Sequence, residues 1–110
     1  MGKTRSFVVT QWNIDCDYLK LVEGGQLQFV AYGEEECPTT GRKHHQAFIY
    51  FHNQKSDEKK KLCKIGKMFG KIQCNVEAMR GSFKQNVAYC SKESELIKIG
   101  DERAEARRAW

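Results

Sequence analysis

The chain has 110 residues, with 19 Lys and Arg side chains against 14 Asp and Glu, which gives a formal net charge of +5 and a pI near 9.0. This length fits one domain, and no apolar run is long enough for a membrane span or a secretory signal, so we expect an intracellular protein without membrane contact. The five cysteines are odd in number and never spaced as Cys-x-x-Cys, which argues against a disulfide framework and a zinc knuckle.

Three strands are predicted in the first half of the chain. Residues 6–11 are rich in Phe and β-branched side chains, and residues 26–32 mix Leu, Phe, Val and Tyr after two glycines. Residues 44–51 alternate two sets of side chains, as a strand does. The loop expected at residues 34–43 could join the second and third strands as antiparallel neighbours.

The positive charge gathers in the middle of the chain, where residues 55–71 carry seven lysines against two acidic side chains. The same segment places Leu62, Ile65 and Phe69 at helical spacing, which predicts an amphipathic helix. Ser56 is its expected N-cap. The lysines form either a solvated helix face or a surface for nucleic acid, and the segment alone favours the solvated face.

A further strand and a further helix are predicted in the second half. Residues 71–79 alternate an apolar with a polar set of side chains, and residues 83–93 have the pattern of a helix. Residues 102–110 are expected to form a weaker, charged helix or a linker. Sheet-forming segments separated by two convincing helices predict an α+β fold, with an antiparallel sheet flanked by helices.

One group of polar residues has the donor types of a metal site. Residues 34–36 are three glutamates, and they precede the strand that carries His44 and Gln46. Because residues i and i+2 of a strand share a face, His44 and Gln46 point together, while His45 points the other way. Carboxylate, imidazole and amide groups together suit Mg²⁺ or Mn²⁺. Taken alone, the same residues are more often an exposed sheet face and a solvated loop.

A second group has the types of a nucleophilic site. Tyr89 and Lys92 lie three residues apart in the helix predicted at residues 83–93, so they share one helix face. A phenol with an ordinary pKa of about 10 is a poor nucleophile at neutral pH, and a nearby cation would favour its phenolate. The alternative is a buried tyrosine with a satisfied hydroxyl beside a surface lysine.

These motifs, in this order, resemble the HUH endonuclease domain of replication initiator (Rep) proteins from circular single-stranded-DNA viruses of the circovirus and nanovirus type. The resemblance extends over residues 6–93. Its pieces are a divergent first motif at residues 7–13, a metal motif at residues 44–46 preceded by residues 33–35, and a nucleophile motif at residues 88–93. Together the pieces are far more specific than any one of them.

The resemblance implies a central antiparallel sheet of about five strands, like that of RNA-recognition domains. It implies that Glu35, His44 and Gln46 bind Mn²⁺ or Mg²⁺. Gln46 occupies the position of the second histidine in the His-hydrophobe-His pattern after which the family is named. Tyr89 would attack DNA and remain linked to a 5′-phosphate, with Lys92 as its electrostatic or water-positioning partner. The expected substrate is single-stranded DNA at a stem-loop origin of rolling-circle replication.

Weaker candidates for DNA contacts come from the first motif, the basic helix and scattered arginines and lysines. They are Arg5, Thr10, Gln11, Trp12, Asn13, Arg42, Lys43, Lys59, Lys67 and Arg80.

The remaining expectations concern organisation and partners. We expect residues 1–110 to be one nuclease domain without the family's helicase domain, with an interdomain linker beginning near residue 101. The isolated domain is expected to be monomeric, the full-length protein oligomeric, and the location the host nucleus. The main rival hypothesis is a non-catalytic, RNA-recognition-like module that binds single-stranded nucleic acid, for which an open sheet and lysines would suffice.

Overall fold

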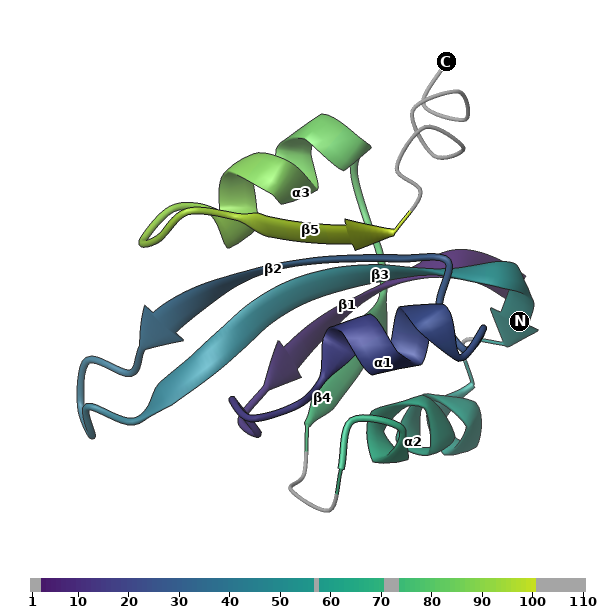
Figure 1. Ribbon diagram of the computed structural model, residues 1–110, viewed down its shortest axis with the longest axis horizontal. Coiled ribbons are helices and arrows are strands. Elements are labelled where there is room, and N and C mark those ends of the chain that lie inside the picture. The colour runs from purple at the N-terminus through teal and green to yellow at the C-terminus, as the bar shows by residue number, and fades with distance from the viewer. Residues whose placement is uncertain (1–2, 57, 71–73, 101–110) are drawn as a thin grey trace.

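The computed structural model describes residues 3–56, 58–70 and 74–100 (Figure 1). The elements in chain order are β1 (Lys3–Gln11), α1 (Tyr18–Glu23), β2 (Phe29–Glu36), β3 (Lys43–Ser56), α2 (Lys59–Lys67), β4 (Asn75–Ala78), α3 (Phe83–Cys90) and β5 (Ile97–Gly100). Within the described residues the strands form one five-stranded antiparallel sheet in the order β4-β1-β3-β2-β5. The first six elements follow the βαββαβ order, and the α+β prediction is confirmed.

Helices cover both faces of this sheet. Helices α1 and α2 lie against one face, and α3 lies against the other (Figure 1). The central strand β3 is therefore buried on both sides from His45 to Phe51. Successive side chains of a strand alternate between the two faces, so each face receives its own set of residues from the same strands.

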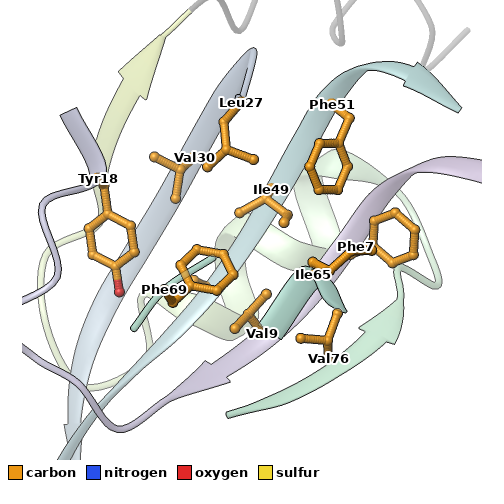
Figure 2. Close-up of a cluster of buried hydrophobic side chains, with 11 residues drawn as sticks. Phe7, Val9, Tyr18, Leu27, Val30, Ile49, Phe51, Ile65, Phe69 and Val76 are labelled. Atoms are coloured by element: carbon orange, nitrogen blue, oxygen red, sulfur yellow. The ribbon is translucent and has the colours of Figure 1, made fainter. Parts of the chain in front are cut away.

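The face under α1 and α2 holds the larger core. Phe7 and Val9 from β1, Ile49 from β3 and Phe69 after α2 pack there with Tyr18 of α1 (Figure 2). All five side chains are buried, so this cluster contributes to stability by removing apolar surface from water.

The face under α3 has a smaller aromatic core and a polar end. Phe29 of β2 and Phe48 and Tyr50 of β3 pack against Phe83 at the start of α3. Ser82 begins this helix with a capping box, in which its hydroxyl accepts from the Gln85 backbone N–H. The aromatic contacts thus fix the first turn of α3 on the sheet.

The structure differs from the predictions at several element boundaries. The glutamates at residues 34–36 belong to β2 rather than to a loop, because β2 continues in register with β3 up to Glu36. Helix α3 ends at Cys90, three residues earlier than predicted. The predicted Ser56 cap is wrong: Glu58 is the N-cap of α2, and the Ser56 hydroxyl instead accepts from the Glu58 N–H.

Two short elements were not predicted, namely α1 and β5. Helix α1 has six residues, too few to show a helical period, and it depends on Asp17, whose carboxylate accepts from the Lys20 N–H. Strand β5 has four residues and pairs only with β2. The first three residues of the strand predicted at 71–79, and the helix or linker predicted at 102–110, lie outside the described residues.

No helix among the described residues has the length and apolar character needed to cross a membrane.

Candidate functional site

The polar end of the α3 face is built by cross-strand neighbours. Glu35 of β2 lies opposite His44 of β3. Gln46 of β3 lies between Gly33 of β2 on one side and Thr10 of β1 on the other. Since these positions alternate with core positions on each strand, the sheet register alone brings a carboxylate, an imidazole and an amide to one end of one face.

Glu35 and His44 form the centre of this polar end. His44 Nε2 lies 3.3 Å from Glu35 Oε1, and both side chains are almost fully buried. Glu35 Oε2 and His44 Nδ1 are buried without a hydrogen-bond partner among the residues described. An unpaired buried polar group costs about 1–3 kcal/mol, so this pair has unused capacity for another group.

The pair fits a hard divalent cation. Two ligand atoms that lie about 2.1 Å from an octahedral ion, at a right angle to each other, are about 3.0 Å apart, close to the separation seen here. Across residues 3–56, 58–70 and 74–100, no three His, Cys, Asp or Glu side chains gather as a metal site. A third protein ligand would therefore have to come from another residue type. The side-chain amide of Gln46, on the same face of the sheet as His44, is the nearest candidate along β3.

Gln46 is placed as predicted, but its amide oxygen already has a partner. The side chain is buried, and its Oε1 accepts a hydrogen bond of 3.2 Å from the Thr10 hydroxyl. This bond orients the carboxamide with its oxygen toward β1. Binding a cation through that oxygen would use its second lone pair or exchange the Thr10 contact.

His45 lies on the opposite face, as the strand pattern predicts. Its Nδ1 is 2.7 Å from the Tyr18 hydroxyl, and its ring packs against Tyr32. Burial lowers the pKa of the His45 imidazole, and Glu34 opposes this effect only in part. His45 is therefore a neutral core residue, and the two adjacent histidines have separate roles.

Helix α3 carries Tyr89 to the same end of the face. Its last residue, Cys90, reaches the sheet at Gly33, where an added Cβ would overlap the Cys90 carbonyl oxygen and lie 3.3 Å from the Ser94 hydroxyl. Only glycine allows this approach. Tyr89, the neighbour of Cys90, is 51% exposed, so its ring lies at the surface beside the buried polar pair.

Lys92 connects the two groups. Its Nζ lies 4.6 Å from the centroid of the Tyr89 ring and 3.9 Å from Glu35 Oε2. Because α3 ends at Cys90, Lys92 lies in the following turn and does not share a helix face with Tyr89 as predicted, yet its ammonium still reaches the phenol ring. The ammonium thus lies over the phenol ring and also faces the carboxylate.

The Cys90 thiol, next to Tyr89 in α3, is a poor nucleophile. Burial raises its pKa to about 12, the negative charge of Glu35 adds to this effect, and Lys92 opposes it. The thiol therefore stays protonated at neutral pH, and a thiol reacts only as its thiolate.

Trp12 forms a wall of the site at the end of β1. Its ring centroid lies 4.7 Å from that of His44, and the guanidinium carbon of Arg42 lies 4.9 Å from the indole centroid on the β2–β3 hairpin side. Trp12 thus packs between an imidazole and a guanidinium. Together with Thr10, which bonds Gln46, Trp12 and Arg42 are the predicted DNA-contact residues that the structure brings to the site.

Other residues predicted to contact DNA have structural partners. Gln11 is fully buried, and its Oε1 accepts from the Asn13 N–H, which leaves it no surface for DNA. The Asn13 amide donates to the Phe69 carbonyl. Arg5 donates to the Phe51 carbonyl and to the Gln28 amide oxygen, away from Tyr89.

The remaining basic candidates are spread over the surface. Lys43 is exposed and lies 3.8 Å from Glu34, and Arg80 is exposed before α3. Lys67 is exposed on α2, which covers the opposite face of the sheet, and the side chain of Lys59 lies outside what the structure describes. The basic helix is therefore separated from the polar end by the sheet.

Gly33 is the site residue that the sequence analysis missed in this role. Its position before the glutamates gives no hint of this role, whereas its lack of a side chain is what admits Cys90. A glycine inside a strand pattern is a usable signal of such a close approach.

The chain resembles known proteins over most of its length. A family model described as "Putative viral replication protein" matches residues 4–93. The Para-Rep C2 of the Milk vetch dwarf C2 alphasatellite is 34% identical over 86 residues, and the Para-Rep C2 of the Subterranean clover stunt C2 alphasatellite is 37% identical over 83 residues. Each alignment covers 76% of this chain but 27% of the relative, so the chain spans little more than a quarter of the length of these curated relatives.

Proposed function

Because the chain belongs to the family of viral replication (Rep) proteins, we propose that it cuts and rejoins single-stranded DNA to initiate rolling-circle replication. The observation that carries this proposal is the position of Lys92, between the Tyr89 ring and the buried pair of Glu35 and His44. A nucleophile, a cation and a buried set of oxygen and nitrogen donors then lie at one end of one sheet face.

The reaction is a transesterification at one phosphate. The Tyr89 oxygen attacks phosphorus, an oxygen–phosphorus bond forms, and the bond from phosphorus to the 3′ oxygen breaks. The phenolic proton passes to water, which the half-exposed ring allows, and the 3′ oxygen takes up a proton to become a free hydroxyl. The reverse reaction rejoins the strands, so the same site performs cutting and strand transfer.

Each neighbour of Tyr89 has a distinct task. The Lys92 ammonium stabilises the phenolate and the charge that develops on the phosphate. Glu35, His44 and Gln46 are the proposed ligands of Mn²⁺ or Mg²⁺, and such an ion, when bound, polarises the scissile phosphate. Trp12 and Arg42 border the site where the strand would enter, the first as a stacking surface and the second as a phosphate contact.

The proposal is tested by trapping the covalent product. A single-stranded stem-loop oligonucleotide pool with a randomised loop carries one fluorophore at its 5′ end and another at its 3′ end, and is incubated with the chain and Mn²⁺. On a denaturing gel we expect protein to carry the 3′ label and a shortened free strand to carry the 5′ label, with neither product in EDTA. Binding without an adduct would instead support the rival hypothesis of a non-catalytic binding module.

Metal binding can be measured without any reaction. Mn²⁺ is expected to quench the fluorescence of Trp12, which packs on His44, in a Trp110→Phe background that leaves Trp12 as the remaining tryptophan. Glu35→Gln is expected to weaken this binding by more than about 100-fold, since losing even an outer partner of a metal site costs about 10- to 100-fold.

Glu34→Gln is the matched control for this titration. It removes the same charge one residue away, on an exposed side chain that points away from His44. We expect Mn²⁺ affinity close to that of the parent chain. An equal loss in both variants would show general attraction of the cation to acidic residues and would contradict the assigned ligands.

A further inference from the structure

A polar hollow lies on the face that carries Tyr89, at the opposite end of α3. Its volume is about 460 Å³, and it is bounded by the start of β1, by β3 and by the segment that leads into α3. Lys3 and Arg5 line it from β1, Gln54 from β3 and Phe83 from the first turn of α3. The core that fixes α3 on the sheet thus leaves an open space beside it.

The lining has two chemically different parts. One side is aromatic, because the Phe83 ring stacks on Tyr50 at 20° with 6.2 Å between centroids. The other side is polar and basic, with Lys3 and Gln54 exposed and Arg5 held by the Phe51 carbonyl and the Gln28 amide. None of the residues that line the hollow is acidic.

These groups match the parts of a nucleotide. Aromatic side chains stack on bases, amides bond base edges, and lysine or arginine neutralises the phosphate. A purely apolar ligand would make no use of Lys3 and Gln54, and a simple anion would leave the aromatic side unused. The composition of the hollow therefore favours a nucleotide over either of them.

The position of the hollow fits a strand that also reaches Tyr89. Six residues of α3 separate Phe83 from Tyr89, which is about 9 Å at a helical rise of about 1.5 Å per residue. A stacked strand advances about 3.4 Å per nucleotide, so this distance corresponds to about three nucleotides. One strand can thus occupy both ends of α3.

We propose that this hollow is a nucleotide subsite, which holds one nucleotide of the substrate strand within about three nucleotides of the scissile phosphate. The inference rests on the proposed function and adds to it a point of sequence selection. In this subsite the base lies against Phe83, Gln54 contacts its edge, and Lys3 contacts the adjoining phosphate.

Abasic scanning tests the subsite. Oligonucleotides with one abasic position each, on either side of the cleaved phosphate, are bound to the full 110-residue chain carrying Tyr89→Phe, so that affinity is measured without cleavage. We expect one position within about three nucleotides to weaken binding by about 5- to 10-fold, as loss of one stacked base does. A Lys3→Ala/Gln54→Ala double variant keeps Phe83 but loses the contact to the base edge and the adjoining phosphate, so it should show a smaller penalty at the same position.

A matched double variant controls for charge and fold. Lys20→Ala/Gln26→Ala removes the same two residue types from exposed positions in and after α1, on the other face of the sheet. It should keep the abasic penalty of the parent chain. A uniform, salt-dependent loss of affinity in the Lys3/Gln54 variant, with the penalty unchanged, would show charge attraction alone and overturn the subsite.

The same oligonucleotides separate the two proposals. An adduct with wild-type chain together with a flat abasic scan overturns the subsite and leaves the proposed function in place. A position-dependent penalty that requires Lys3 and Gln54, without any adduct, overturns the nuclease and leaves a binding hollow. No adduct and a flat scan overturn both.

Discussion

Tyr89→Phe is expected to abolish the covalent adduct completely and to leave DNA affinity nearly unchanged. The substitution removes one oxygen from a half-exposed ring and keeps the ring face that lies against Lys92. We expect a total loss because, in the proposed reaction, the phenolic oxygen is the atom that bonds phosphorus. The protonated Cys90 thiol, with a pKa of about 12, is no substitute.

The measurement is a denaturing gel for the adduct beside fluorescence anisotropy for binding. Tyr32→Phe is the control, because Tyr32 is a partly buried tyrosine on the opposite face of the sheet that packs on Tyr18 and His45. It should form adduct at the wild-type rate. An adduct retained by Tyr89→Phe would assign the nucleophile to another residue.

Gly33→Ala is expected to slow adduct formation by about 100-fold or more while Mn²⁺ binding persists. The added Cβ would overlap the carbonyl oxygen of Cys90, so the C-terminal end of α3 must move away from β2. Overpacking of this kind costs about 1–3 kcal/mol of stability. A shift of about 1 Å in a reacting group costs about 100-fold in rate, and here the group that moves is Tyr89.

The design of this test separates misplacement from unfolding. Quenching of Trp12 by Mn²⁺ reports that Glu35 and His44 are still together, because both lie on the sheet rather than on α3. Gly25→Ala is the control: its φ of 82° makes alanine strained, but no atom lies within 4 Å of the added Cβ. It should lower the melting temperature and keep the adduct rate. Adduct formation at the wild-type rate in Gly33→Ala would refute the positioning role.

Much of this architecture follows from local pattern, and the exceptions have physical causes. Strand alternation correctly separates His44 from His45. Successive side chains of a strand point to opposite faces, so the face of one residue fixes the face of the next. The same reasoning could not place Glu35 opposite His44, since that depends on where the β2–β3 hairpin turns. The carboxylates were assigned to a loop, and the observed register with β3 extends β2 through them.

The contribution of α3 was also only partly predictable. Its motif identified Tyr89 and Lys92, but the pattern did not show that the helix ends between them. The contact of Cys90 with Gly33 joins segments 57 residues apart. The only sign of it in the local sequence is a glycine within a strand pattern. The contact of Trp12 with His44 is similarly long in range, and it arises because β1 ends beside the start of its neighbour β3.

The division of the two adjacent histidines between opposite faces bears on which length changes the chain can tolerate. A residue gained or lost among residues 38–40, at the tip of the hairpin, alters an exposed connection and leaves the β2–β3 register and the contact of Arg42 with Trp12 in place. A residue gained or lost inside β3 would turn His45 toward Tyr89 and His44 toward the buried Tyr18 hydroxyl. The core imidazole of His45 and the proposed metal ligand His44 would then exchange faces of the sheet. We therefore expect the chain to tolerate a length change at the tip of this hairpin and not a few residues away, inside β3.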